Sequence, residues 1–365
     1  MLESATIEAR RTGRQDALND ALERLEGYEY LDLPGPFACH GPMGAEALST
    51  LGYDDLVADW VEAYKSRHEP LDPFPTLESI DPRDEASWRG ALGQVFRAND
   101  FTAMFAGELD NEPWQDVLRR WLARLFEGSA GGLSHGIIRS AHAVRAMPDE
   151  GVPSELALRE LARALGLWAA VYTALPGHPE LKGSLDLNSA VASLPRPTDA
   201  WAPIEAGTFS RMGELDRFSV AVEALGRPQA GDAAFSDLSA AFCRLLLEFP
   251  DLDPIPLVHM VTPIGAARSL LPYLSGLTLE AVYTHLWQVS AAIVCGFTPA
   301  PLRKNREVRE VDETISPDEL IARVIEHRDP HVLKFSEVCL SEHWNRSDPV
   351  YLVAAEHVLN NTSPL

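Results

Sequence analysis

The chain has 365 residues, of which 46% are hydrophobic, and carries a formal net charge of −23. This apolar content can fill a sizeable core, and the length allows one large domain or two. The acidic balance argues against a nucleic-acid-binding surface, because phosphate contacts need clustered Lys and Arg side chains. We therefore expect a soluble globular protein whose partners are small molecules rather than nucleic acids.

No segment reads as a targeting or membrane sequence. Residues 1–14 contain no apolar run of the secretory type, and Glu280, His285 and Gln288 interrupt the most apolar stretch, 270–297. Four scattered cysteines form no C-x-x-C pair: Cys39, Cys243, Cys295 and Cys339. Buried thiols in a reducing cytoplasm fit this pattern better than a zinc knuckle or a disulfide framework. We predict a cytoplasmic protein that makes no contact with a membrane.

Helical periodicity runs along the chain, and no convincing alternating strand pattern or repeat interrupts it. Capping residues and apolar spacing place helices, in chain order, at 16–27, 42–48, 54–64, within 88–126, at 131–145, 153–172, 211–225 and 233–248, after 253, at 279–295 and 316–328, and from 329 and 349. The prediction is an all-α chain, 1–365, forming a single large helical domain with a buried central cavity for a metal and a substrate.

Two segments read as connections between helices. Residues 195–203 are rich in proline and are the best candidate for a hinge or long crossover, but composition does not change across them, so we do not divide the chain there. Residues 302–315 are rich in charge and flanked by prolines, which predicts a solvated loop or a flexible flap.

The stretch 131–145 carries three nitrogen-bearing side chains at helical spacing, namely His135, Arg139 and His142. In a helix these lie on one stripe. Ser134 fits an N-cap that places His135 in the first turn, where the helix dipole disfavours protonation and leaves a neutral imidazole suited to a metal. The alternative is an exposed basic face.

Further histidines stand at comparable positions. His40 and His331 lie at predicted helix starts, and His259 lies among apolar neighbours, where a lone histidine is more often a core residue than a ligand. Histidines distributed over separate helices are how metal sites are built inside helical bundles. His285 lies on another apolar helix, where it could likewise be a core residue or a ligand.

Lys334 lies one turn after His331, on the same helix face. Desolvation and the helix dipole would favour its neutral amine, which can add carbon dioxide and become an anionic carbamate ligand. Histidines with one anionic oxygen suit Fe(II) or a related ion better than Mg²⁺ or Ca²⁺. The alternative is that Lys334 reaches solvent and pairs with Glu337 or Asp329.

Common catalytic signatures are missing from the sequence. It contains no P-loop, H-E-x-x-H, G-x-S-x-G or His-Asp doublet, and no dinucleotide fingerprint supports NADPH binding. The segments that carry a family resemblance are 39–43, 46–48, 60–64, 114–121, 135–143, 258–262 and 329–335. In this order, over about residues 18–357, they resemble the questin oxidase-like proteins, which are associated with oxidative ring opening of anthraquinone-type polyketides.

The resemblance implies a specific site. Family members are described as NADPH-dependent Baeyer–Villiger-type oxidases, and a non-haem iron site with histidine and carboxylated-lysine ligands is associated with the group. By position, it implies metal ligands at His40, His135, His259, His331 and Lys334. The chain departs from the family at Cys39, where asparagine is expected, at Arg139, where relatives tend to carry histidine, and at His142, where they carry an aromatic residue.

The leading hypothesis is an Fe(II)-dependent oxygenase that cleaves, or inserts oxygen into, an aromatic polyketide-like or quinone-like ring, with dioxygen as co-substrate. Arg139 and His142 would orient a phenolate or superoxide, and either His142 or His285 could replace a proposed ligand. Two alternatives stay open. One is a zinc-dependent hydrolase with the same histidines. The other is a non-catalytic helical protein that binds aromatic compounds and whose histidines lie too far apart to share an ion.

Overall fold

The computed structural model describes residues 2–28, 39–70, 74–177, 180–196, 209–215, 217–228, 231–298 and 315–365. Within these ranges every regular element is a helix, and only two isolated β-bridges occur, which confirms the all-α prediction. The α-helices are α1 (Leu2–Arg24), α2 (Gly41–Thr50), α3 (Val57–Arg67), α4 (Glu85–Ala91), α5 (Ala98–Asn111), α6 (Trp114–Leu125), α7 (His135–Arg145), α8 (Glu155–Ala170), α9 (Leu187–Ser193), α10 (Phe218–Glu223), α11 (Ala233–Leu247), α12 (Pro254–Val258), α13 (Thr262–Leu270), α14 (Leu279–Phe297), α15 (Pro317–His327), α16 (Pro330–Arg346) and α17 (Val350–Asn361).

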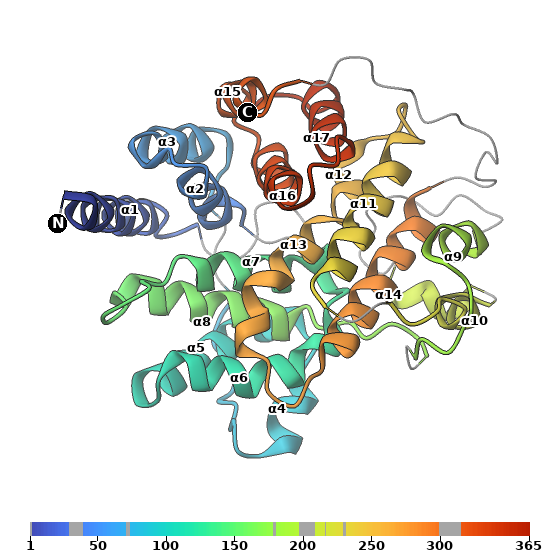
Figure 1. The fold of residues 1–365 in the computed structure, drawn as a ribbon. Coiled ribbons are helices and arrows are strands. Elements are labelled where there is room, and N and C mark those ends of the chain that lie inside the picture. Colours follow the sequence, from blue (N-terminus) through green and yellow to red (C-terminus); the bar gives the residue numbers. More distant parts are fainter. Residues whose placement is uncertain are drawn as a thin grey trace.

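Helix α7 lies at the centre of the fold (Figure 1). It packs against α8 on one side and against α13 and α2 on others, and α16 in turn packs on α2 and α13. Helices from the amino-terminal part, the middle and the carboxyl-terminal part of the chain therefore meet around one centre. The arrangement forms a single domain with one contiguous apolar core.

Helix α7 approaches α8 closely because Gly136 has no side chain. A Cβ atom at this position would lie 2.6 Å from Cγ of Trp168 and 2.7 Å from its Cα, which is closer than packed atoms allow. Ten of the eleven residues of α7, all but Arg145, are buried. The alternative interpretation, an exposed basic face on this helix, is therefore wrong.

Local capping signals placed several helix starts correctly. The Ser154 hydroxyl accepts a hydrogen bond from the Ala157 backbone N–H at 3.1 Å, and Asp329 accepts one from His331 N–H at 2.8 Å. The prediction of one helix over 211–225 is wrong, because the left-handed backbone of Arg217 (φ 66°) separates a short 3₁₀ turn, Ser210–Glu214, from α10. Gly213 lies in the 3₁₀ turn before the break, but Arg217 itself carries no sequence signal for a positive φ.

Two predicted connections cannot be compared with the structure. Apart from residues 195, 196 and 315, the hinge at 195–203 and the loop at 302–315 lie outside the described residues. Among the helices of the described ranges, none combines the length and the apolar character needed to cross a membrane.

Candidate metal centre

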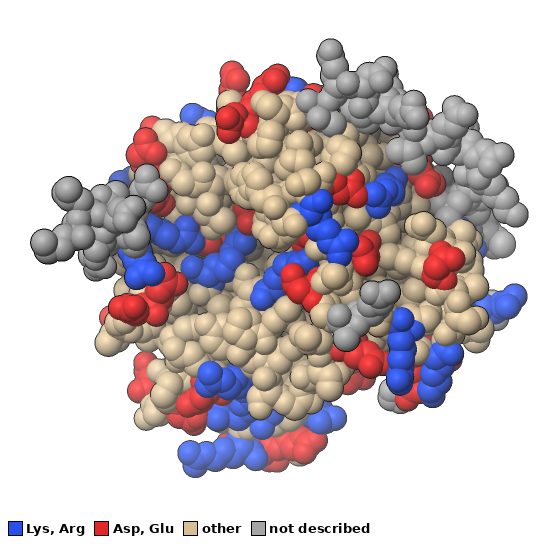
Figure 2. Space-filling model, viewed as in Figure 1, with Lys and Arg blue, Asp and Glu red and all other residues tan. Residues whose placement is uncertain are grey.

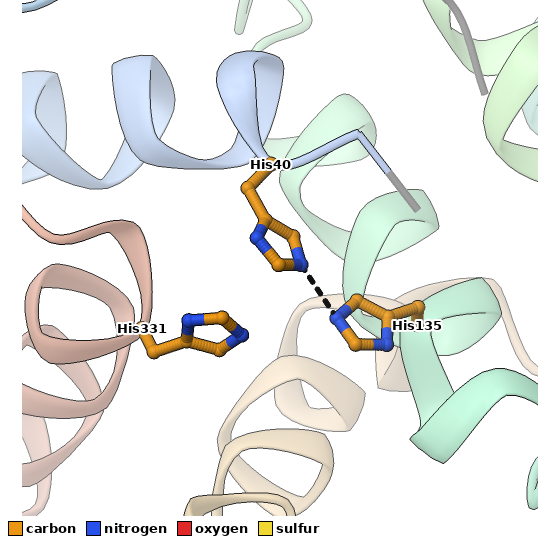
Figure 3. A group of neighbouring side chains, drawn as sticks. All are labelled: His40, His135 and His331. Atoms are coloured by element: carbon orange, nitrogen blue, oxygen red, sulfur yellow. Dashed lines mark hydrogen bonds between the residues drawn. The ribbon is translucent and has the colours of Figure 1, made fainter. Parts of the chain in front are cut away.

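Three helix starts bring three histidines together (Figure 3). His40 directly precedes α2, His135 is the first residue of α7, and His331 lies in the first turn of α16. One ring nitrogen from each lies within 4.8 Å of the others, and these three residues form the group of potential metal ligands within the described part of the chain. Each helix start points a side chain at the same centre.

The closest pair has the spacing of two ligands of one ion. The Nε2 atoms of His40 and His135 lie 2.8 Å apart, drawn as the dashed line in Figure 3. Two nitrogens bound at right angles, each about 2.1 Å from an ion, would be about 3.0 Å apart. The contact is a hydrogen bond between the two rings in this structure, and the same spacing would allow both nitrogens to bind one ion.

A backbone contact fixes the tautomer of His135. Its Nδ1 lies 2.5 Å from the Gly132 carbonyl oxygen, so Nδ1–H donates and Nε2 keeps its lone pair for the centre. His259 is oriented in the same way, because its Nδ1 lies 2.8 Å from the Ile255 carbonyl oxygen. Hydrogen bonds from ligand histidines to carbonyl oxygens are common around metal ions.

An unusual turn delivers His135. Gly132, Leu133 and Ser134 all have left-handed φ values, of 56°, 53° and 66°. For residues other than glycine such a conformation costs about 1–2 kcal/mol each. Strain of this kind is concentrated at functional sites. Ser134 occupies the N-cap position as predicted, but it makes no capping hydrogen bond; its buried hydroxyl has no partner in the described structure.

His259 and Lys334 lie next to the three-histidine group, and His259 is not among the histidines whose ligand nitrogens lie within 4.8 Å of one another. His259 ends α12, with its ring centroid 4.9 Å from that of His135 and 5.8 Å from that of His331. Lys334 is 3% exposed, and its Nζ lies 3.9 Å from Sδ of Met43. The side chain is thus buried at the centre and does not reach solvent.

Burial keeps the imidazoles of His40, His135 and His259 neutral. It lowers the pKa of His40 well below its usual value, and the positive charges of Lys334 and His331 lower it further. The pKa values of His135 and His259 are lowered by the same causes, burial first. Neutral imidazoles are the form that binds metal ions. The donor set therefore fits Fe(II) or Zn²⁺ better than Mg²⁺ or Ca²⁺.

Arg139 faces a carboxylate. Its Nε and Nη2 donate to the two oxygens of Glu160 at 2.7 and 2.9 Å, and both side chains are buried. This bidentate pair ties α7 to α8. Arg139 also lines a small cavity with Met43 and His142, so its predicted role in orienting a substrate stays a prediction.

His142 belongs to a buried charged network. Its Nδ1 lies 2.6 Å from a Glu46 carboxylate oxygen that also accepts from Arg145, and Arg145 reaches Glu337 at 3.0 Å. Burial and Arg145 lower the pKa of His142 to about 4, although Glu46 opposes them. Burial alone would raise the pKa of Glu46, but Arg145 and the His142 hydrogen bond bring it well below its usual range.

The sequence did not predict a role for Glu46, and it suggested Glu337 only as a partner of Lys334. Glu46 is a lone charge on the otherwise apolar helix α2, which is the same signal that drew attention to Lys334. The rule that a lone charged residue on an apolar helix suggests a functional role would therefore also have identified Glu46. His285 lies elsewhere, with its ring centroid 6.4 Å from that of Phe126, and burial lowers its pKa. It is outside the three-histidine group.

Two cavities border the lysine and the network. One of 20 Å³ touches Met43 and His142, and one of 10 Å³ touches His142 and Lys334. Each has room for about one water-sized molecule. An aromatic ring does not fit in either. The open edge of the cluster is His331, whose side chain is 15% exposed beside Asp329.

Comparison with known proteins adds no family assignment. No protein-family model matches the chain, and no curated protein matches it significantly. The likeness to questin oxidase-like proteins therefore stays a prediction from the sequence.

Proposed function

We propose that this protein is a non-haem Fe(II)-dependent oxygenase that cleaves, or inserts oxygen into, an aromatic polyketide-like or quinone-like ring. The observation that carries the metal is the convergence of His40, His135 and His331, with ligand nitrogens within 4.8 Å of one another. Bound iron would supply the activation of dioxygen. The oxidative chemistry itself rests on the sequence resemblance to questin oxidase-like proteins.

The position of each side chain indicates the role that it would have in this reaction. His40, His135 and His331 would hold the ion, with His259 as a further ligand behind them. The aromatic substrate would approach the open His331 edge, because the described cavities on the inner side are water-sized. A cavity of 20 Å³ suits dioxygen rather than a ring. His142 and Arg139 line that cavity and would set its polarity.

Lys334 would supply the anionic ligand. The neutral amine adds carbon dioxide to form a carbamate and releases one proton, so that an uncharged nitrogen becomes an anionic oxygen ligand. The buried position of Lys334 supports this step, because a protonated lysine among four histidines has no solvent to stabilise its charge.

The close spacing bears on the two alternatives. A non-catalytic binding protein was expected to hold its histidines too far apart to share an ion, and spacing within 4.8 Å argues against it. A zinc hydrolase would use the same imidazoles. Oxygen consumption with a hydroxylated quinone distinguishes the oxygenase from the hydrolase, because hydrolysis consumes none.

Elemental analysis of the purified protein tests the site. We expect about one equivalent of iron in the wild type and in His357→Ala, a control on α17. We expect at least a tenfold loss in His135→Ala, because even the loss of a residue that only supports a ligand lowers metal affinity about 10- to 100-fold. Lys334→Ala should lose metal and regain part of it with added acetate, which replaces the missing carboxylate. Full metal content in both site variants would overturn the proposal.

A further inference from the structure

A second, larger cavity lies away from the histidines, at the surface between α4 and α6. It measures 530 Å³, within the range of about 300–1,000 Å³ that is usual for small-molecule sites. Three of its lining residues are arginines: Arg83, Arg89 and Arg124. Figure 2 shows basic side chains gathered with acidic ones at the lower edge of this face, where Figure 1 places α4.

Arg124 is the fixed cation of this cavity. Its guanidinium carbon lies 4.8 Å from the ring centroid of Trp88 and 4.5 Å from that of Trp121. These two indoles are themselves packed edge to face, at 5.4 Å. Contacts of this kind hold a planar guanidinium in place and leave its edge open for an acceptor. Arg124 is therefore positioned before any ligand arrives.

The carboxylates near Arg124 form hydrogen bonds and ion pairs with other side chains. Glu108 accepts from Arg120 at 2.7 Å and also from the Trp121 indole, and Glu85 pairs with Arg89 at 2.7 Å. Arg124 itself donates to the Pro82 carbonyl oxygen at 3.4 Å and has no ion pair with any described residue. Burial, with the neighbouring charge of Arg120, lowers the pKa of Arg124. Its positive charge is thus under-compensated.

The rest of the lining completes an anion site. Arg83 is exposed at the rim and likewise has no ion-pair partner within the described ranges. The third carboxylate of the region, Glu127, accepts a hydrogen bond from the Tyr172 hydroxyl at 3.3 Å. Leu92 and Ala123 add a small apolar surface. The two rings beside Arg124 are already covered by guanidinium groups, so a ligand would meet Leu92 and Tyr172 rather than stack on Trp88.

We propose that this cavity binds a small organic anion, whose carboxylate or phosphate is held by Arg124 and Arg83 while its apolar part lies against Leu92 and Tyr172. The chain as a whole is strongly acidic and repels anions at long range, so capture must depend on these short-range contacts. Guanidinium groups suit both head groups because they donate two parallel hydrogen bonds. The site is independent of the proposed metal centre.

Tryptophan fluorescence of the full-length protein reports binding directly, because Trp88 and Trp121 contact Arg124. We would titrate with inorganic phosphate and, separately, with benzoate, and expect saturable quenching by at least one probe. The stronger of the two identifies the head group. Arg124→Gln should weaken binding at least tenfold. Arg124→Lys keeps the charge but loses the planar fork, so its affinity should lie between those of the wild type and Arg124→Gln.

Arg119→Gln is the matched control. Arg119 lies on the same helix, exposed and paired with Asp116 at 2.6 Å, so its loss should leave binding unchanged. Circular dichroism checks that each variant is folded. If Arg124→Gln does not fold, the exposed Arg83→Glu variant decides, because reversing a rim charge should also weaken binding at least tenfold. No saturable quenching by either probe, or quenching unchanged in these variants, would overturn the proposal.

Discussion

The Nε2 atoms of His40 and His135 lie 2.8 Å apart, although 95 residues separate them in the chain. Each histidine stands at the start of its own helix, and a third, His331, completes the group from the carboxyl-terminal part. Bringing three imidazoles together, those of His40 and His135 buried, costs desolvation of their ring nitrogens. A shared metal ion would offset that cost, because it would replace lost hydration with ligand bonds.

Removing metal should destabilise the protein only while the histidine cluster is intact. An ion present at about 100 times its dissociation constant stabilises the folded state by about 2.7 kcal/mol. A chelator should therefore lower the melting temperature of the wild type and of His357→Ala, but not that of His135→Ala. Calorimetric scans with and without chelator measure this. If the chelator left the wild-type melting temperature unchanged, the protein would hold no stabilising ion.

The pH dependence of stability should carry the signature of His142. Its folded pKa, about 4, lies below the ordinary histidine value of 6.5, so its neutral form favours folding. This contribution is present above pH 6.5 and is lost as pH falls from 6.5 to about 4. A shift of this size is worth about 3 kcal/mol. The Glu46 carboxylate, whose pKa is lowered, loses its own contribution at still lower pH.

Denaturant unfolding between pH 4 and 8 tests this for His142→Gln against the wild type. Glutamine keeps a donor toward Glu46 but does not titrate. The free energy of unfolding of the variant should fall less between pH 6.5 and 4, and the difference between the two curves isolates His142 from the other histidines. Parallel curves would show that His142 does not titrate as its burial requires.

Gly136→Ala should disturb both packing and the metal site. The added methyl group would meet Trp168 at 2.6 Å and would push α7 away from α8. Overpacking of this kind costs about 1–3 kcal/mol. Because His135 is the adjacent residue, metal affinity should fall as well. Gly90→Ala on α4 is the control: no atom lies within 4 Å of its added Cβ, so the change should be neutral or stabilising.

Local chemistry made some of this fold predictable from sequence and left the rest out of reach. The starts of α8 and α16 could be placed because Ser154 and Asp329 cap backbone N–H groups within three residues of themselves. The meeting of His40 with His135 is a long-range event that helical periodicity does not encode; it was suggested by the position of both residues at predicted helix starts and by the family resemblance. The left-handed turn before His135 was also beyond prediction. The paired glycines at 131 and 132 are compatible with such a turn, but Leu133 and Ser134 carry no sequence signal for positive φ.

The pairing of Arg139 with Glu160 permits a test of the role first expected for that arginine. Arg139→Leu alone leaves a buried carboxylate without its partner, which costs about 3–5 kcal/mol. The double variant Arg139→Leu/Glu160→Leu removes both charges and should recover most of that stability, because apolar replacements of a buried ion pair are often neutral. Measurements of stability alone therefore cannot reveal a role of Arg139 in the reaction. The activity of the folded double variant can.

Oxygen consumption by the folded double variant separates the two roles of Arg139. If the arginine only ties α7 to α8, the double variant should keep its metal and most of the wild-type kcat and KM. If it also orients an anionic substrate or dioxygen across the 20 Å³ cavity, activity should fall at unchanged metal content and melting temperature. A charge-assisted hydrogen bond is worth about 1.5–3 kcal/mol, which corresponds to a loss of roughly 10- to 150-fold in kcat/KM. Double variants with wild-type kinetics would assign Arg139 to the fold alone.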